Sequence, residues 1–126
     1  MLLHAITDAL LGALAAPDIG ALFPPSDPKW KGADSAIFLL EALKRVDDEG
    51  YAVSNIDASL ILAAPKIGPH ASAIRTRVAE LLGVRGDCVG LKAKTPEGLN
   101  LDAAAIAHVV VLLKRVPHKR SGVRSR

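Results

Sequence analysis

The sequence is poor in cysteine, in aromatic residues and in long apolar runs, and each shortage excludes something. Cys88 is the only cysteine in 126 residues, so an intrachain disulfide cannot form. Two Phe, one Trp and one Tyr leave the core to be built from Ala, Val, Ile and Leu. The longest apolar runs, such as residues 105–113 with His108 inside, fall well short of the ~20 residues of a membrane span. We therefore expect no transmembrane segment and no membrane partner.

The start of the chain lacks the features of an export signal. Met1 is followed by an amphipathic pattern, without a basic first segment or a small-residue cleavage site, so we expect a cytoplasmic protein. The length suits about one domain. We predict a single domain over residues 1–115, lacking the N-terminal strands of its family as argued below, and a tail over residues 116–126.

The positive net charge of +3 is confined to the end of the chain. Six of the 16 basic residues lie in the last 13 positions, which contain no acid, so the rest carries 10 basic against 13 acidic residues, a net charge of −3. Such charge runs seldom fold, and we predict a solvated, disordered tail. The acidic body argues against a nucleic-acid partner, although an RNA contact through the tail is an alternative.

Apolar spacing predicts three helices. The first has Leu3, Ile6, Leu10 and Leu14 on one face and ends before Pro17. Four prolines make residues 17–28 a loop. The second helix is capped by Asp34 or Ser35 and ends at Gly50, and the third begins near Pro69 and ends at Gly83. We expect these side chains to face the core: Ile37, Leu40, Leu43 and Val46 in the second helix, and Ile74, Val78 and Leu81 in the third.

Three segments between and after these helices read as strands. In residues 51–62, Ile56, Ala58 and Leu60 alternate with polar residues, and further strands are predicted over residues 88–94 and 105–113. The fold class is therefore α/β (α+β), with a mixed sheet covered on one face by helices. The last strand is almost continuously apolar, which favours burial on both faces and a partner subunit.

Several separate motifs resemble one enzyme family. They are Leu3-His4-Ala5-Ile6-Thr7-Asp8 and the following residues to Ala13, Asp18-Ile19-Gly20, Leu22-Phe23-Pro24, Asp27-Pro28, Lys31 to Ser35, Asn55-Ile56-Asp57, Ala64-Pro65-Lys66, Pro69-His70, and Lys92 to Glu97. In this order they resemble 2-C-methyl-D-erythritol 2,4-cyclodiphosphate synthase over about residues 2–113. The resemblance thus covers nearly the whole chain outside the tail.

The resemblance implies a homotrimer with active sites at subunit junctions. There, the 2-phosphate of a cytidine diphosphate derivative of methylerythritol attacks the β-phosphorus and CMP leaves, in non-mevalonate isoprenoid synthesis. Bringing two anions together requires neutralisation of their charge, which metal ions supply efficiently. In the family this is zinc, together with magnesium or manganese.

His4 matches the third zinc ligand of the family, after an Asp-X-His pair on the first strand. Taken without its neighbours, it would be a helix histidine that only forms a hydrogen bond. Asp8, four residues later, projects from the same side of the helix and could orient His4, or could be an exposed helix carboxylate.

The resemblance also assigns the substrate site. Thr95 matches the residue proposed to stabilise the transition state. The residues that match substrate-binding positions are Asp18, Ile19 and Gly20 for the methylerythritol unit, Phe23, Pro24, Pro25, Ser26 and Asp27 in the adjoining substrate loop, Leu62, Ala63, Ala64, Pro65, Lys66, Ile67 and Gly68 for cytosine, Lys94, Pro96 and Glu97 for phosphate and ribose, and Leu101 after them. Pro25 replaces a frequent aspartate and Leu101 a frequent phenylalanine. Lys66 could equally be a solvated surface lysine.

The chain departs from the family before His4, because no Asp-X-His strand and no His-Ser-Asp segment precede it. A single imidazole does not hold a catalytic zinc. We therefore expect little or no cyclase activity from these 126 residues alone. A non-catalytic trimeric remnant that keeps the nucleotide pocket is the alternative.

Overall fold

The computed structural model describes residues 1–62, 68–94 and 105–117, which build a mixed sheet of three strands. The strands are β1 (Tyr51–Leu62), β2 (Val89–Lys94) and β3 (Ala105–Arg115). The central strand β1 pairs parallel with β2 and antiparallel with β3. The predicted mixed sheet is confirmed, with β2 beginning one residue later than expected because Cys88 belongs to a 3-10 turn, η2 (Gly86–Cys88).

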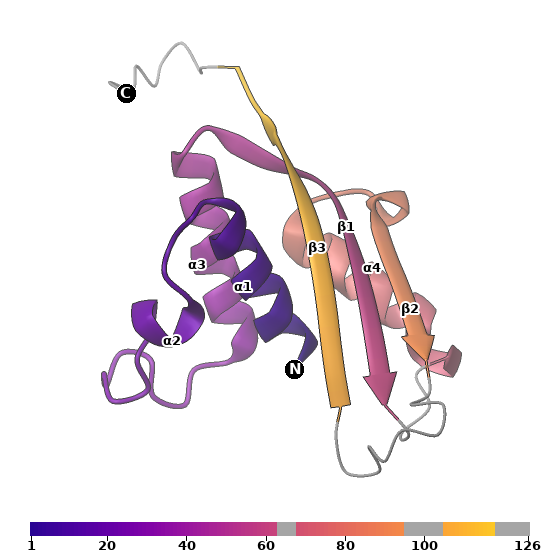
Figure 1. The fold of residues 1–126 in the computed structure, drawn as a ribbon, viewed down its shortest axis with the longest axis horizontal. Coiled ribbons are helices and arrows are strands. Elements are labelled where there is room, and N and C mark those ends of the chain that lie inside the picture. Colours follow the sequence, from indigo (N-terminus) through magenta and orange to yellow (C-terminus); the bar gives the residue numbers. More distant parts are fainter. Residues whose placement is uncertain (63–67, 95–104, 118–126) are drawn as a thin grey trace.

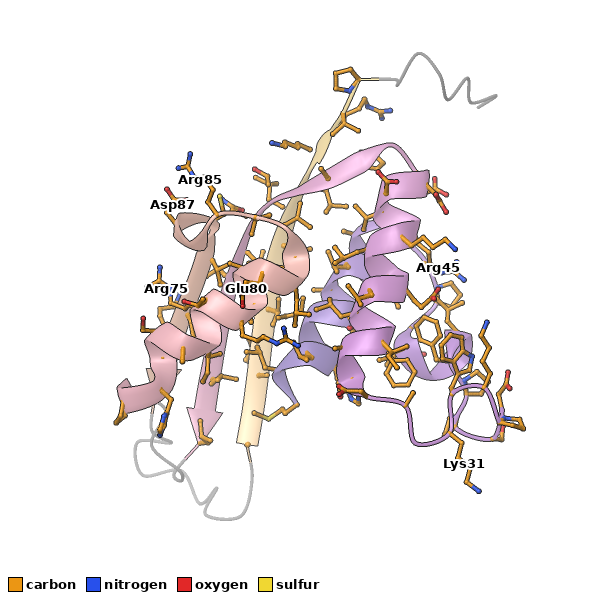
Figure 2. All side chains as sticks on the ribbon, turned by 180° about the vertical axis from the view of Figure 1, so that it is seen from behind. Lys31, Arg45, Arg75, Glu80, Arg85 and Asp87 are labelled. Atoms are coloured by element: carbon orange, nitrogen blue, oxygen red, sulfur yellow. The ribbon has the colours of Figure 1, made fainter. Side chains whose placement is uncertain are left out.

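Three helices cover one face of this sheet. They are α1 (Leu2–Ala13), α3 (Ser35–Asp48) and α4 (Ala71–Leu82). In Figure 1, α4 lies behind the strands and α1 and α3 lie to the left of them, and in Figure 2, α4 lies in front. Helices α1 and α3 lie side by side, and α4 packs over β2. A four-residue helix, α2 (Ile19–Leu22), interrupts the predicted loop, and a 3-10 turn, η1 (Gly68–His70), precedes α4. No helix in the described residues is both long and apolar enough to cross a bilayer.

The first helix packs as its spacing predicts. Ile6, Leu10 and Leu11 are fully buried, and Leu3 and Leu14 pack against the same core. His4 and Asp8 stand on the exposed side. The helix ends at Ala13, and the chain then passes through Ala15, whose φ of 57° is left-handed, before Pro17. This turn starts the segment that contains α2.

The predicted core face of the second helix is partly wrong. Val46 is buried and Leu43 half-buried, as expected, but Ile37 and Leu40 are 44% and 51% exposed, and Leu39 and Ala42 are buried in their place. Residues 36–40 are all apolar, so spacing alone allows two neighbouring stripes along this helix. Packing of α3 against α1 and β1 selects the stripe that contains Leu39.

The side chains of β1 that face the helices are odd-numbered at the start of the strand and even-numbered after it. Ile56, Ala58 and Leu60 are buried, as alternation predicts, but Val53 is buried as well. A shift of register between Val53 and Asn55 leaves one extra residue in β1 opposite β3, which is a β-bulge. The bulge therefore lets both halves of β1 direct apolar side chains towards the helices.

One face of β3 is open within a single chain. Val109, Val111 and Leu113 pack against the core, whereas Val110 and Leu112 are 70% and 58% exposed. The predicted burial on both faces is therefore not met by this chain alone. The open face lies opposite the helical layer, because side chains alternate across a strand.

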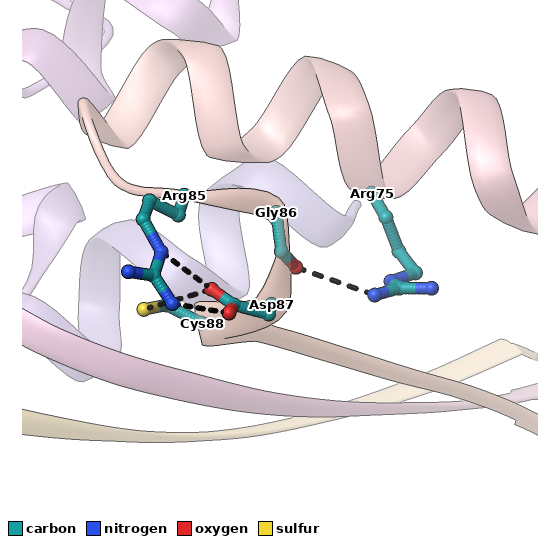
Figure 3. Close-up of polar contacts among 5 residues, drawn as sticks. All are labelled: Arg75, Arg85, Gly86, Asp87 and Cys88. Atoms are coloured by element: carbon teal, nitrogen blue, oxygen red, sulfur yellow. Dashed lines mark hydrogen bonds and ion pairs between the residues drawn. The ribbon is translucent and has the colours of Figure 1, made fainter.

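Polar contacts at the end of α4 fix its connection to β2. Gly83 ends the helix with a left-handed φ of 70°, as predicted for a C-terminal glycine. The Arg75 guanidinium donates to the carbonyl of Val89 at 3.1 Å. It also donates to the carbonyl of Gly86 at 3.3 Å, and Arg85 forms an ion pair with Asp87 (Figure 3). Arg75 thus ties α4 to the turn that leads into β2.

Candidate functional site

His4 lies in the first turn of α1 with its ring exposed to solvent. Its Nε2 atom is 3.1 Å from the hydroxyl oxygen of Ser35, the first residue of α3. The ring of Phe38 meets the imidazole edge to face, with centroids 6.0 Å apart and planes inclined by 62°. The imidazole is therefore held at the surface junction of α1 and α3, outside the aliphatic core, where it is accessible to a ligand.

Asp8 lies one turn after His4 but acts on a different element. Its Oδ1 atom accepts a hydrogen bond of 2.9 Å from the backbone N–H of Ile19, the first residue of α2. Within the described residues no hydrogen bond joins Asp8 to His4, so the suggestion that Asp8 orients His4 is not supported by the structure. Asp8 is exposed, as the alternative reading had it, and it fixes the start of the segment that the resemblance assigns to substrate.

The predicted methylerythritol segment is a compact turn. Asp18 caps α2 by accepting the N–H of Ala21 at 2.9 Å, and Asp27 accepts the N–H of Lys29 at 3.0 Å. Pro25, Ser26 and Gly20 are exposed, while Ile19 and Pro24 are half-buried. Asp18 is exposed too and uses only one of its two oxygens for the cap within the described chain. Its second oxygen is available to accept a hydrogen bond from a ligand hydroxyl.

Phe23 differs from the other residues of this segment because its side chain is buried. Its ring packs against Trp30, with centroids 4.8 Å apart, and against Phe38, with centroids 5.3 Å apart. Aromatic pairs at such separations stabilise one another beyond their burial. The Phe23 ring thus anchors the loop to α3, and only its backbone is left for substrate.

The two remaining predicted segments begin at neighbouring strand ends. Leu62 is the last residue of β1 and Lys94 the last of β2, and Ile61 pairs with Lys94. Because these strands are parallel, their carboxyl ends meet at one edge of the sheet, where open α/β sheets bind ligands. Gly68 lies in η1. The other predicted residues lie outside the described residues: Ala63, Ala64, Pro65, Lys66, Ile67, Thr95, Pro96, Glu97 and Leu101.

His4 and the carboxyl ends of β1 and β2 lie towards the same end of the molecule. In Figure 1 the N-terminal end of α1, which carries His4, and the carboxyl ends of β1 and β2 all lie at the bottom. Within residues 1–62, 68–94 and 105–117, no hydrogen bond or ion pair joins the His4 group to the strand ends. The described residues therefore bring His4 and the two strand ends, which belong to the predicted site, towards one end of the molecule, with no polar contact between them.

The described residues do not make a zinc site by themselves. Among them, no three His, Cys, Asp or Glu side chains gather closely enough to hold a metal ion. A catalytic zinc takes three protein ligands, and His4 fits as one of these because it is exposed and has a ring nitrogen free of Ser35. No step of chemistry can be derived through a metal from this donor set alone.

Sequence reasoning missed the two residues that touch His4. The sequence indicates Ser35 as a possible helix cap, a role that Asp34 takes by accepting the N–H of Ala36, and it indicates no role for Phe38. The available signal was that Ser35 closes the motif of residues 31–35, which is part of the resemblance. Its contact with His4 depends on how α1 packs on α3, which spacing does not reveal.

The mixed sheet with one helical layer defines an α+β domain, with an exposed imidazole beside a proline-rich loop. A sequence profile of the YgbB family matches residues 1–114. The chain belongs to this family, the 2-C-methyl-D-erythritol 2,4-cyclodiphosphate synthases, which are metal-dependent lyases of non-mevalonate isoprenoid synthesis. The family expectation is confirmed.

Relatives from bacteria and plants share this assignment. The synthase of Koribacter versatilis is 66% identical over 115 residues, which cover 91% of this chain and 74% of the relative. The chloroplastic synthase of Arabidopsis thaliana is 50% identical over 118 residues, which cover 91% of this chain but only 51% of that protein. A solved synthase in a CDP-bound form, 42% identical, superposes with a TM-score of 0.86 over 89% of this chain and 74% of its own. The fold prediction is thereby confirmed.

Proposed function

We propose that this chain takes part in the cyclisation of 4-diphosphocytidyl-2-C-methyl-D-erythritol 2-phosphate. In this step an oxygen of the 2-phosphate forms a bond to the β-phosphorus, the bond from that phosphorus to the bridging oxygen breaks, and CMP leaves with that oxygen. The observation that carries the proposal is the arrangement on α1. One helix turn holds His4 against Ser35, and the next holds the Asp18 segment through the bond from Ile19 to Asp8.

Each group has a role that follows from its chemistry. His4 supplies one ligand of a zinc site that further ligands must complete, and a second divalent ion, magnesium or manganese, accompanies it. When bound, these ions neutralise the phosphate charge as it develops. The free oxygen of Asp18 accepts a hydroxyl of the methylerythritol unit, and exposed Lys94 pairs with a phosphate. Thr95 remains the proposed transition-state donor.

The cytidine diphosphate part of the substrate is proposed to lie at the carboxyl ends of β1 and β2. Two lines of reasoning support this position. Solved relatives, including one from Plasmodium falciparum with a TM-score of 0.76, are CDP complexes. The register that sets Ile61 beside Lys94 also brings the ends of β1 and β2, from which the two predicted binding segments continue, to one edge of the sheet.

We further propose a homotrimer, located in the cytoplasm, in which the open face of β3 is covered by another copy. Val110 and Leu112 would otherwise leave an apolar surface in water. Light scattering after size exclusion should give three times the chain mass. The variant Leu112→Asp should reduce this mass, whereas Ile37→Asp, which alters an exposed apolar residue on α3, should not. A monomeric wild-type chain would contradict the trimer.

The function is tested best in a chimera. We expect the 126-residue chain with zinc and magnesium to release far less CMP than the Koribacter versatilis enzyme. Joining the segment that precedes the matched region of that enzyme to Met1 should raise both CMP release and zinc content. The His4→Gln chimera should lose both. A chimera that folds and binds zinc but releases no CMP would sink the proposal.

The alternative function is a non-catalytic nucleotide-binding trimer. It is favoured by one observation, the absence of a three-donor metal group among the described residues. Calorimetric titration with CDP, together with measurement of the zinc content of the purified chain, distinguishes the cyclase from this alternative. CDP binding by a protein that is free of zinc, together with an inactive chimera, favours the alternative.

A further inference from the structure

We propose that Ser35 is a positioning residue for His4. The Ser35 hydroxyl forms a hydrogen bond with Nε2 of the imidazole, and this leaves Nδ1 as the nitrogen that binds a divalent metal. The part that concerns the metal rests on the proposed function. The orientation of the ring does not, because it follows from contacts within this chain. The experiment below therefore has separate arms for the two parts.

The contact between Ser35 and His4 joins two elements far apart in sequence. The Oγ atom of Ser35 and Nε2 of His4 are 3.1 Å apart, across 31 residues and at the junction of α1 with α3. The backbone on the Ser35 side is fixed, since Asp34 caps α3 by accepting the N–H of Ala36 at 3.0 Å. The hydroxyl therefore meets the ring from a rigid helix end.

Phe38 supplies a second contact from the same helix. It lies three residues after Ser35, and residues at this spacing share a helix face. Its ring meets the His4 ring at 6.0 Å and also packs against Phe23 and Trp30. The imidazole is thus held by a hydrogen bond at one nitrogen and by an edge-to-face contact with the packed ring of Phe38.

The two nitrogens of His4 consequently differ. A neutral imidazole carries a proton on one nitrogen and a lone pair on the other, and a metal takes the lone pair. If Nε2 carries the proton and donates it to Ser35 Oγ, the lone pair is on Nδ1. Within the described residues no hydrogen bond engages Nδ1. Fixing the tautomer and orientation of a ligand through its second nitrogen is how proteins prepare metal-binding histidines.

The metal-free arm uses 15N-labelled full chain and imidazole-optimised proton–nitrogen NMR, with His4 assigned through His4→Gln. Read through the carbon-bound ring protons, the nitrogen shifts should show a protonated Nε2 and an unprotonated Nδ1. This Nε2–H signal should weaken towards the tautomer mixture of a free imidazole in Ser35→Ala and persist in Ser35→Thr, which keeps the hydroxyl. Ser72→Ala is the matched control, because Ser72 is an exposed serine in the first turn of α4. A proton found on Nδ1, or a signal unchanged in Ser35→Ala, would overturn the orientation.

The second arm adds zinc to the same variants made in the chimera described above, because His4 alone does not hold zinc. We expect the Nδ1 resonance of His4 to shift while the Nε2–H signal stays, and we expect Ser35→Ala to need about 10- to 100-fold more zinc for the same shift. Loss of the Nε2–H signal on zinc addition, or no change at either nitrogen, overturns the assignment of Nδ1 to the metal. A failed chimera in the CMP assay leaves both NMR arms readable, so the two failures are distinguishable.

Discussion

Asp8 on α1 accepts the backbone N–H of Ile19 at 2.9 Å, so the helix that carries His4 also holds the first turn of α2. We predict that Asp8→Ala speeds hydrogen exchange of the Ile19 amide and lowers the free energy of unfolding by about 0.5–1.5 kcal/mol. Asp8→Asn keeps an acceptor oxygen and should retain most of the protection. An Ile19 amide that exchanges equally in wild type and Asp8→Ala would show that the bond is absent in solution.

Adjacent leucines on α3 should respond very differently to truncation. Leu39 is fully buried and Leu40 is half exposed. We predict a loss of about 2–5 kcal/mol for Leu39→Ala, from lost burial and the cavity left behind. Leu40→Ala should change stability by less than about 0.5 kcal/mol, as is usual for surface positions. Urea unfolding of both variants tests this, and equal losses would contradict the observed face of α3.

Two glycines provide a matched test of backbone conformation. Gly83 has a left-handed φ of 70° at the end of α4, where a Cβ atom would meet strain but no neighbour. We predict that Gly83→Ala lowers stability by about 1 kcal/mol. Gly12 lies inside α1 with open space around it, so Gly12→Ala should raise stability by up to about 1 kcal/mol. Thermal unfolding of the two variants should therefore shift in opposite directions.

The ion pair between Arg85 and Asp87 predicts a dependence on pH. A hydrogen bond from the Arg85 guanidinium, the largest cause, holds the pKa of Asp87 below its usual value of 3.8. A carboxylate with a lowered pKa stabilises the fold above that usual value, and this contribution is lost as the pH falls through the pKa in the folded state. Asp87→Asn should therefore lower the melting temperature at pH 7, but less and less as the pH drops towards 2.

The size of this effect should be small and sensitive to salt, because both side chains are exposed. Glu80→Gln, which changes an exposed carboxylate on α4 instead, is the control. A gap between Asp87→Asn and wild type that widens on acidification would contradict the sign of the pKa shift.

The sequence predicted most of the sheet and of α1, because these elements follow simple periods. Alternation placed Ile56, Ala58 and Leu60 inward, and three-to-four spacing placed Ile6 and Leu10 in the core. It could not decide between Leu39 and Leu40, since five consecutive apolar residues satisfy two helical stripes. That choice is made by α1 and β1, which lie elsewhere in the chain.

The candidate site was predicted in its parts but not in its connections. The exposure of His4 and the turn at Asp18 followed from local pattern and resemblance. The bonds from Ser35 to His4 and from Ile19 to Asp8 span 31 and 11 residues and exist only once the helices have packed. The roles of Thr95 and of the segments outside the described residues stay predictions.

The extra residue in β1 near Ser54 has a consequence for how this chain tolerates changes of length. Before it, odd-numbered Val53 points inward, and after it, even-numbered Ile56 does. Deleting Ser54 would restore unbroken pairing with β3, and Val53 and Ile56 would then be two positions apart and would both keep facing the helices. The sheet should therefore tolerate loss of this one residue, because the deletion removes the bulge without changing which side chains of β1 face the helices.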